Sequence, residues 1–582
     1  MADAAASMHS PAALPAGPSS WNRQRYSWVV PILIVVMLVM LVPPIVHLVE
    51  TSFYTTKPDG SFGDFTFRYY QDMVANPRFM RYAINTTIYA AGSAVVAIVL
   101  GVGQAWIVER TNTPFRQYVF LFSIVSLGIP NVLYTVSWLL ILGKSGPVNA
   151  LLMALTGSKE PVFEVYTMWG MIVIEGISWA PLAFLMLSSV FRAADASFEE
   201  ASLMSGASIG KTFHNITLKL AMPAVLALTM LIVIRAFESF EIPALVGLPG
   251  NVYVLATDIY DAVNRTIPPN YGQAGAFSMG LLAIVIVMLY YYNRLSRHAE
   301  RYQTITGKGY RPRLMNLGSL RYVTAGVLVL FFIVIIVLPV GILLWASFLP
   351  YHQHFSFDAL QTLTTRNYVN VFNSQSLRGS VGNTVILGIG AATFTASFTA
   401  LCAWFAVRRY KGAWLLDQLA TAPLIFPAIV LGVAMLQVYL QLPFPFYGTL
   451  ISIIFACAIR YLPYGMRYAY AGILQIHTEL EEASSISGAR QLATFLRIVV
   501  PLVAPALMTC WLFVFLLAVK AVSLPILLVG PDSQIVAVTL FDMWQNGQIT
   551  ELAAMGVSWM AFMTVISTVF YVVARRYGLT VQ

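Results

Sequence analysis

The chain has 582 residues, of which 58% are hydrophobic and 10% are charged. Soluble domains carry roughly 25% charged residues, so this composition excludes an ordinary soluble protein and indicates a polytopic membrane protein. The formal net charge of +9 comes from basic residues in short loops between apolar runs. Positive-inside topology explains that distribution without a nucleic-acid partner.

Cysteine usage gives no sign of a disulfide framework or a metal centre. Cys402, Cys457 and Cys510 all fall in apolar runs and show no C-x-x-C spacing. The seven histidines are scattered along the chain, and no cluster of histidine and acidic residues has metal-ligand spacing. We therefore expect no metal site.

The chain opens with an Ala/Ser/Pro-rich stretch, and residues 1–27 are expected to form a disordered cytoplasmic tail. Twelve apolar runs follow, each about long enough to cross a hydrocarbon core of roughly 30 Å. They lie near 28–48, 82–108, 118–142, 166–190, 221–246 and 277–292, and then near 322–348, 381–407, 415–440, 450–471, 502–529 and 555–574. The prediction is an all-α integral membrane protein with about 12 transmembrane helices in two pseudo-symmetric six-helix halves, 28–293 and 322–582.

The segment between the halves, residues 294–321, fixes the expected orientation. It is a basic linker with a single acid, Glu300, against seven basic residues: Arg294, Arg297, Arg301, Lys308, Arg311, Arg313 and Arg321. Such an excess places the linker in the cytoplasm. Counting spans outward from it places both termini in the cytoplasm as well.

Two segments repeat each other without a gap. SFEEASLMSGASIGKTFHNITLKLAMPA begins at Ser197, ELEEASSISGARQLATFLRIVVPLVAPA begins at Glu479, and Glu200 and Glu482 are 282 positions apart. The repeat extends to Asn85-Thr86 with Asn383-Thr384 and to Arg110 with Arg408, at an offset of 298. Register of this length indicates duplication of the half.

Each repeated segment has the pattern of a short capped helix. Ser197-x-x-Glu200 and Thr478-x-x-Glu481 fit a capping box, and Gly206 and Gly488 would end or bend the helix. Either segment alone could be a capped surface helix between two spans. Two copies at equivalent points of the two halves favour a functional role.

These residues resemble a known motif. Glu200-Ala201-Ser202-x-x-x-Gly206 and Glu482-Ala483-Ser484-x-x-x-Gly488 are similar to the E-A-A-x-x-x-G loop of binding-protein-dependent ABC importer permeases, although Lys219 stands where the family has proline. We call residues 197–220 and 479–501 the E-A-A loops. The resemblance implies that they couple to an ATPase. The coupling residues would be Glu199, Glu200, Ala201 and Gly206 in the first loop and Glu481, Glu482, Ala483 and Gly488 in the second.

The same resemblance implies partners and a mechanism. The E-A-A loops of the family sit in grooves on homodimeric ATPase subunits, which bind ATP and Mg²⁺, and a periplasmic binding protein delivers the solute. Two fused halves look most like ferric-iron permeases of a bacterial inner membrane, and relatives handle phosphonate, thiamine or polyamines. ATP-driven closure of the ATPase would give alternating access.

No cofactor is expected in the chain itself. Gly206 to Thr212 resembles a phosphate-binding loop, but that motif needs four residues between its glycines and this segment has three. The segment also lies between two spans and does not follow a buried strand. ATP hydrolysis is therefore expected from a partner, and this chain is not expected to be an enzyme.

Five charged residues fall in or beside the predicted spans, where burial of an ion costs roughly 2.5 to 3.5 kcal/mol on insertion scales. They are Glu175, Arg235, Glu238, Glu241 and Lys520. Lys520 is the repeat counterpart of Glu238, which suggests a pair across the pseudo-twofold axis. Arg235 and Glu238 could instead neutralise each other on one helix face. The functional interpretation is a polar lining of the translocation path.

The main alternative is a secondary transporter with 6+6 helices that is driven by an ion gradient. Its common superfamily has a G-x-x-x-D-R-type basic loop between the second and third spans. Here that loop reads VERTNTPF from Val108, so the signature is absent.

Overall fold

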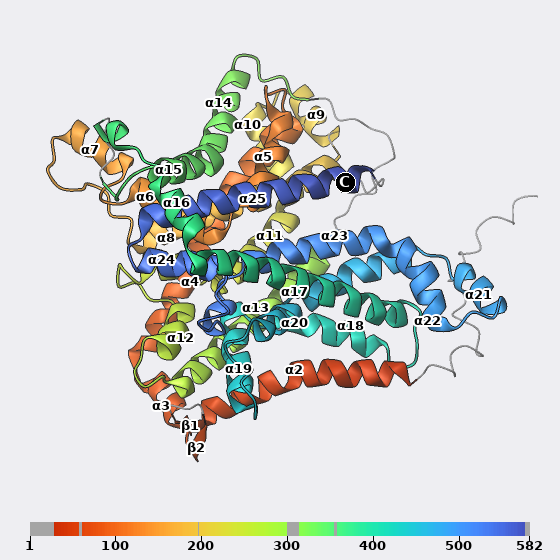
Figure 1. The fold of residues 1–582 in the computed structure, drawn as a ribbon. Coiled ribbons are helices and arrows are strands. Elements are labelled where there is room, and N and C mark those ends of the chain that lie inside the picture. The colour runs from red at the N-terminus through yellow and green to blue at the C-terminus, as the bar shows by residue number, and fades with distance from the viewer. Residues whose placement is uncertain (1–27, 58–60, 196, 300–313, 354–357, 577–582) are drawn as a thin grey trace, which may run out of the picture. The chain divides into compact units, whose positions relative to one another are not determined.

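The computed structural model describes residues 28–57, 61–195, 197–299, 314–353 and 358–576, and almost all of them are helical (Figure 1). In that part of the chain, eleven helices are long and apolar enough to span a membrane, or twelve when one sharply bent pair counts as a span. The predicted all-α class and span number are confirmed. The tail at 1–27 and half of the linker at 294–321, residues 300–313, lie outside the described residues.

The element bounds follow the repeat. The first sequence half contains α2 (Val29–Phe53), β1 (Tyr54–Thr56), β2 (Phe62–Phe65), α3 (Arg68–Ala75), α4 (Pro77–Arg110), α5 (Val119–Leu127), α6 (Asn131–Leu142), α7 (Pro147–Thr156), α8 (Met168–Ala193), α9 (Ser197–Met204), α10 (Ile209–Thr212), α11 (Leu218–Phe237), α12 (Leu255–Asn264) and α13 (Tyr271–Ala299). The second contains α14 (Leu320–Phe332), α15 (Leu338–Ser347), α16 (Arg366–Asn373), α17 (Gln375–Val407), α18 (Trp414–Thr421), α19 (Ala428–Gln441), α20 (Leu450–Leu474), α21 (Glu479–Ile486), α22 (Gln491–Thr494), α23 (Val500–Val519), α24 (Val536–Gln545) and α25 (Ile549–Arg576). β1 and β2 form an antiparallel pair.

The third span of each half is broken, which corrects the prediction of continuous spans at 118–142 and 415–440. In the first half α5 ends at Leu127 and α6 begins after Pro130. In the second half the chain bends by 106° between Ile425 and Ala428, around Pro427. Proline lacks an amide donor and disfavours helical backbone in the residue before it, so each break falls at a proline.

The fifth spans end earlier than the predicted bounds of 246 and 529. The α-helices stop at Phe237 and Val519, and the chain continues through the irregular segments 238–254 and 520–535. Each contains a proline, Pro243 or Pro525, in a short turn whose residues are buried. Irregular backbone at membrane depth is tolerated where protein surrounds it, which fits the burial of these turns.

The described chain forms two compact units, and each combines spans from both sequence halves. Within the described residues, unit 1 consists of 28–45, Ile386–Leu424 and Ile454–Ala518, and unit 2 of Val46–Val385, Ile425–Ile453 and 519–576. Each unit is described by itself.

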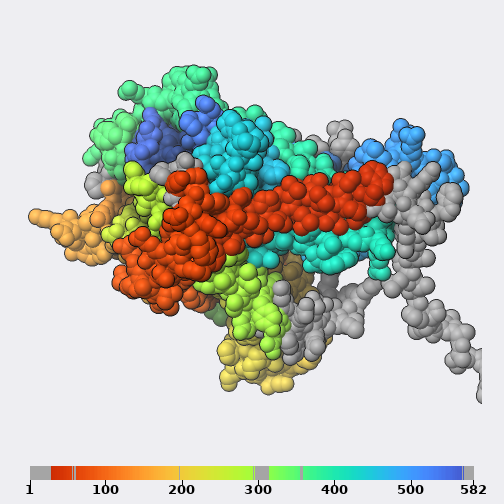
Figure 2. Space-filling view, turned by 90° about the horizontal axis from the view of Figure 1, so that it is seen from below, coloured from red at the N-terminus to blue at the C-terminus, as the bar shows by residue number. Residues whose placement is uncertain are grey.

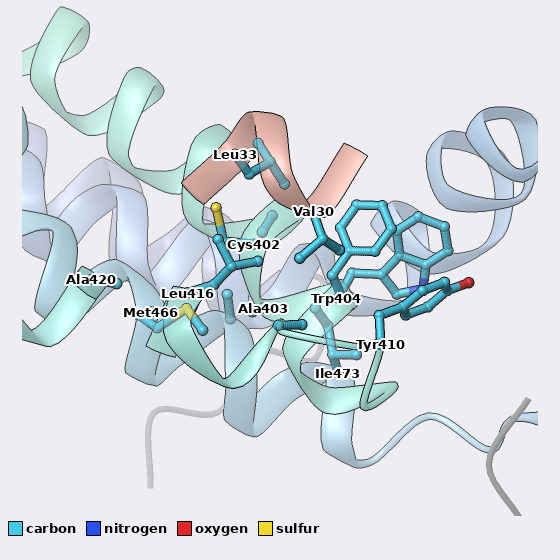
Figure 3. Close-up of a cluster of buried hydrophobic side chains, with 14 of the residues drawn as sticks. Val30, Leu33, Cys402, Ala403, Trp404, Tyr410, Leu416, Ala420, Met466 and Ile473 are labelled. Atoms are coloured by element: carbon cyan, nitrogen blue, oxygen red, sulfur yellow. The ribbon is translucent and has the colours of Figure 1, made fainter. Parts of the chain in front are cut away.

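The core of unit 1 packs against one face of the start of α2. Val30, Leu33 and Met37 of α2 pack with Trp404 and Met466 from the second half (Figure 3). The opposite face of α2 is uncovered in Figure 2 and carries the exposed side chains of Val35 and Val39, as expected of a helix that faces lipid. The first span of the first half therefore packs among helices of the second half.

The core of unit 2 is built on α4 and α8, which pack along each other, with α11 against both. Leu328 of α14 belongs to this core, and Phe331 packs with Ala180 of α8. The first span of the second half therefore packs among helices of the first half. The two halves exchange their first spans in a reciprocal way.

Candidate functional site

Each E-A-A loop holds a two-turn helix that ends at a left-handed glycine, as predicted. After α9, Gly206 has a φ of 82°, and after α21, Gly488 has a φ of 81°. The Ala207 amide donates to the Ser202 carbonyl at 3.1 Å, and the Ala489 amide makes the matching bond to Ser484. This is a Schellman termination, which glycine adopts without the strain of a β-carbon.

The predicted capping box at the second loop is wrong. Thr478 has helical backbone and makes no side-chain cap bond, and Glu481 binds Arg408 in place of the helix amides. At the first loop the α-helix already includes Ser197, and its amide donates to the Asp195 carboxylate at 2.9 Å. That bond lowers the pKa of Asp195.

Arg110, the last residue of α4, fastens the first loop. Its Nε lies 3.3 Å from Oε1 of Glu199, and both side chains are at least 95% buried. Another guanidinium nitrogen donates to the Ala194 carbonyl at 2.9 Å, and the Thr217 hydroxyl donates to Glu199 at 2.8 Å. Burial raises the pKa of Glu199, and the attraction of Arg110 offsets only part of this effect.

Arg408 fastens the second loop in the same way. Its Nε and a terminal nitrogen donate to Oε1 of Glu481 at 2.9 and 2.7 Å, and it also donates to the Ile476 carbonyl at 3.1 Å. The Trp404 indole donates to the other carboxylate oxygen at 3.1 Å. Charge-assisted bonds of this kind are among the stronger ones in proteins.

A hydroxyl pair closes each loop on itself. Ser202 and Thr212 lie 2.9 Å apart, and their counterparts Ser484 and Thr494 lie 2.8 Å apart. Each loop then enters the fifth span through a π-helical turn, at Phe213–Thr217 and Phe495–Val499. Such turns are rare and occur frequently at functional sites.

The outward side of both loop helices carries apolar side chains at equivalent positions. Met204 and Ile486 are 89% and 87% exposed, and Phe198 and Leu480 are about half exposed. Glu200 and Glu482 are of intermediate exposure. Glu199 and Glu481 are thus turned into the permease, while the second glutamate of each pair and the apolar residues form the outer surface.

Substitution of the left-handed glycines is expected to misplace these helices. Gly206→Val or Gly488→Val should cost roughly 1 to 2 kcal/mol of backbone strain, because open space surrounds the new Cβ and only the positive φ resists it. We expect severalfold less ATPase to copurify with the tagged permease. Gly210→Val is the matched control, because Gly210 has equally open surroundings without a positive φ. An equal loss of ATPase in Gly210→Val and in Gly206→Val or Gly488→Val would contradict the prediction.

The charged residues of the spans form two groups within unit 2. Glu175 of α8 accepts hydrogen bonds from the Trp179 indole at 2.8 Å and the Ser239 hydroxyl at 3.2 Å. Tyr89 of α4 donates to Ser239 at 3.3 Å. The single charge of the fourth span is therefore tied to the irregular segment 238–254.

The second group lies where the fifth spans end. Arg235 pairs with Glu238 at 3.3 Å, which supports the alternative of neutralisation within one helix face. Glu241 accepts from Ser523 at 2.9 Å, and Lys520 donates to the Leu127 carbonyl at the end of the broken helix α5 at 3.1 Å.

We call these two groups of charged residues the polar region. The two halves contribute unequally to it. Glu175, Glu238 and Glu241 all belong to the first half, and their repeat counterparts are Cys457, Lys520 and Ser523. Among the residues that the structure describes, no group of three His, Cys, Asp or Glu side chains is placed to hold a metal ion.

Sequence reasoning missed the partners of Glu199, Glu481 and Glu241. Arg110 and Arg408 were visible as a repeated pair, but nothing local assigned them to Glu199 and Glu481. Ser523 is the counterpart of Glu241, so the repeat register could have suggested that contact.

Comparison with known proteins identifies the fold family. The family described as "Binding-protein-dependent transport system inner membrane component" matches residues 97–297 and 388–578. A ferric transport system permease protein FbpB from Actinobacillus pleuropneumoniae is 28% identical over 81% of this chain and 68% of its own length. A putative ferric transport system permease protein FbpB 1 from Haemophilus influenzae is 28% identical over 78% and 71%.

More distant relatives are named for other solutes. The spermidine/putrescine permease PotC of Escherichia coli is 24% identical over 34% of this chain and 74% of its own length. Among solved structures, a bacterial ABC transporter involved in the import of alginate matches with a TM-score of 0.40 and 20% identity, covering 48% of this chain and 98% of its own.

Proposed function

Because the chain belongs to the family of binding-protein-dependent transport system inner membrane components, we propose that it forms the translocation path of an ATP-driven importer and couples to separate ATPase subunits through its E-A-A loops. One observation carries the coupling proposal: two short helices, each fastened by a buried arginine, present apolar side chains outward at equivalent positions. The family match sets aside the ion-gradient-driven transporter as an alternative.

The outer surfaces of α9 and α21 suit a helix-in-groove contact. Met204 and Ile486 would enter apolar grooves, and Glu200 and Glu482 would face basic residues at the rim. Two equivalent helices match the two equivalent grooves of a homodimeric ATPase, since a homodimer repeats each surface. ATP and Mg²⁺ would bind there, and this chain would supply no catalytic group.

The proposed docking of the E-A-A loops on the ATPase also sets the orientation of the chain in the membrane. The E-A-A loops, the linker and both termini would lie in the cytoplasm of a bacterial cell, and a periplasmic binding protein would deliver solute to the opposite side. The excess of basic residues in the linker supports this orientation.

The proposed solute is ferric iron, carried as cargo. Support comes from the FbpB relatives and from the three first-half carboxylates, Glu175, Glu238 and Glu241, in the polar region of the spans. A polyamine is the second candidate, because PotC is similar and amines are also cations. The three carboxylates would repel an anionic phosphonate. None of the relatives named above is a thiamine permease.

Reconstitution would test this function. The permease, purified from its own membranes with any bound ATPase, is placed in liposomes with the periplasmic binding protein of the same importer. Uptake of radiolabelled Fe(III) citrate that requires MgATP supports ferric import, and competition by putrescine would point to a polyamine. A permease that carries no ATPase contradicts the coupling proposal.

Double-mutant cycles would show which charged side chains of the polar region interact. We expect the coupling energy between Arg235→Met and Glu238→Gln, measured from unfolding temperatures in detergent, to exceed that between Glu238→Gln and Lys520→Met. The reason is the 3.3 Å contact between Arg235 and Glu238, whereas Lys520 donates to a carbonyl. Additive losses for Arg235 and Glu238 would show that the pair contributes nothing.

A further inference from the structure

The helix α4 binds a different element toward each of its ends. It is 34 residues long and lies wholly within unit 2. Arg110 is its last residue and Thr86 is its tenth, in the third turn, and 24 residues at 1.5 Å each separate the two by about 36 Å. One end holds the first E-A-A loop through the buried Arg110–Glu199 pair.

The third turn of α4, in the opposite part of the helix, holds the start of α12. The Leu255 amide, the first of that helix, donates to the Thr86 hydroxyl at 3.0 Å, and Asn85 donates to the Tyr253 carbonyl at 2.9 Å. Thr86 is only 1% exposed. The residue before α12 is Val254, whose side chain cannot cap a helix, so Thr86 supplies an acceptor that the local sequence lacks.

The same two attachments recur in the second half, each within its own unit. The Val536 amide, the first of α24, donates to the Thr384 hydroxyl at 2.8 Å, and Asn383 donates to the Gln534 carbonyl at 3.0 Å. Arg408 holds Glu481. The sequence repeats Asn-Thr and Arg at one common offset of 298, so the residues that make both attachments recur in the second half.

Close packing makes α4 suited to move as one body with α8. A Cβ added to Gly101 of α4 would lie 2.5 Å from the Ala183 side chain, and one added to Gly176 of α8 would lie 2.5 Å from Val96. Small residues at such contacts allow two backbones to approach closely. Contact along the length of the pair leaves little room for bending.

We propose that α4 is a rod that transmits movement of the first E-A-A loop to α12, with Arg110 and the Asn85-Thr86 pair as positioning residues toward its two ends. The inference rests on the proposed docking of the loop on an ATPase. The segment 238–254, which carries Glu238 and Glu241, leads directly into α12, so movement of α12 would open or close the polar region. The inference is confined to the first half, where every contact lies in one unit.

Spin labels would report this transmission without knowledge of the solute. Leu155→Cys on α7 and Asn264→Cys at the end of α12 place both labels on exposed positions of unit 2. The native cysteines 402, 457 and 510 are buried, which limits labelling at them. The complex with its ATPase is placed in nanodiscs, and the distance between labels is measured with and without MgATP and vanadate.

In the otherwise unsubstituted protein we expect vanadate trapping to shift the distance between the labels. Thr86→Val, which removes the acceptor for α12, should reduce the shift at least twofold while the ATPase stays bound. Thr86→Ser should restore it. Thr87→Val is the matched control, because the Thr87 hydroxyl is exposed and bonds only within its own helix, to Ala83.

Other results of the distance measurement would overturn the inference or the proposed function. An unchanged shift in Thr86→Val with the ATPase bound overturns the inference, and so does the absence of any shift in the unsubstituted complex. If Thr86→Val does not fold, Arg110→Gln with Glu199→Gln replaces it at the other end, and a full shift there overturns the inference equally. Failure of the unsubstituted permease to bind an ATPase would refute the proposed function instead.

Discussion

A permease that carries both Glu200→Lys and Glu482→Lys is expected to insert and fold but to lose its ATPase. Both carboxylates lie on the outer side of the loop helices, while the neighbouring glutamates, Glu199 and Glu481, hold the helices in place. Reversed charge facing a basic groove costs several kcal/mol in like-charge contacts. We therefore expect binding at least a hundredfold weaker, measured by titrating purified ATPase onto the permease in nanodiscs.

The control for charge alone is Glu160→Lys, which alters an exposed acid in the loop after α7. It should leave both ATPase binding and the unfolding temperature unchanged. If the double variant binds ATPase as well as the unsubstituted chain does, the E-A-A loops are not the docking site.

The second large effect concerns the buried pair that fastens the first loop. Arg110→Gln alone should destabilise the permease by about 3 to 5 kcal/mol, because it leaves the Glu199 carboxylate buried without its cation. Arg110→Gln with Glu199→Gln should recover most of this loss. Burial already raises the pKa of Glu199 despite the arginine, so the charged pair itself contributes little net stability. Unfolding temperatures in detergent, compared at one pH, would measure both variants.

An ion pair nearby whose cation is exposed provides the comparison. Arg192 lies 2.8 Å from Glu109, but its side chain is 62% exposed. Arg192→Gln should therefore cost no more than about 1 kcal/mol. A loss in Arg110→Gln as small as that would mean that the buried pair does not fasten the loop.

Hydropathy and the repeat predicted much of this fold for identifiable reasons. Spans are long apolar runs, and the glycines that end α9 and α21 are the residues that a left-handed turn requires. Hydropathy failed at 238–254 and 520–535, because it does not distinguish apolar residues buried in protein from those that face lipid. Pro130 and Pro427 marked the broken third spans, but the apolar run continues through both.

The contacts that build the loops could not be read from local sequence. Arg110 and Glu199 are far apart in the chain, and only the packing of α4 against α8 brings the end of α4 to the loop. The capping box failed for the same reason, since Arg408 competes for Glu481 more strongly than a helix amide does.

The reciprocal exchange of first spans has a consequence for biogenesis. The partners of α2 in unit 1 include Met466 and Val503, so α2 enters the bilayer long before they are made. At about 5 to 20 residues per second, synthesis of the intervening chain takes roughly 25 to 95 s. During that time the face formed by Val30, Leu33 and Met37 is covered by lipid or by the insertion machinery. Insertion of the halves can thus proceed in sequence, while their folding is completed only together. A gene truncated at the linker would encode a half that lacks the second-half partners of Val30, Leu33 and Met37.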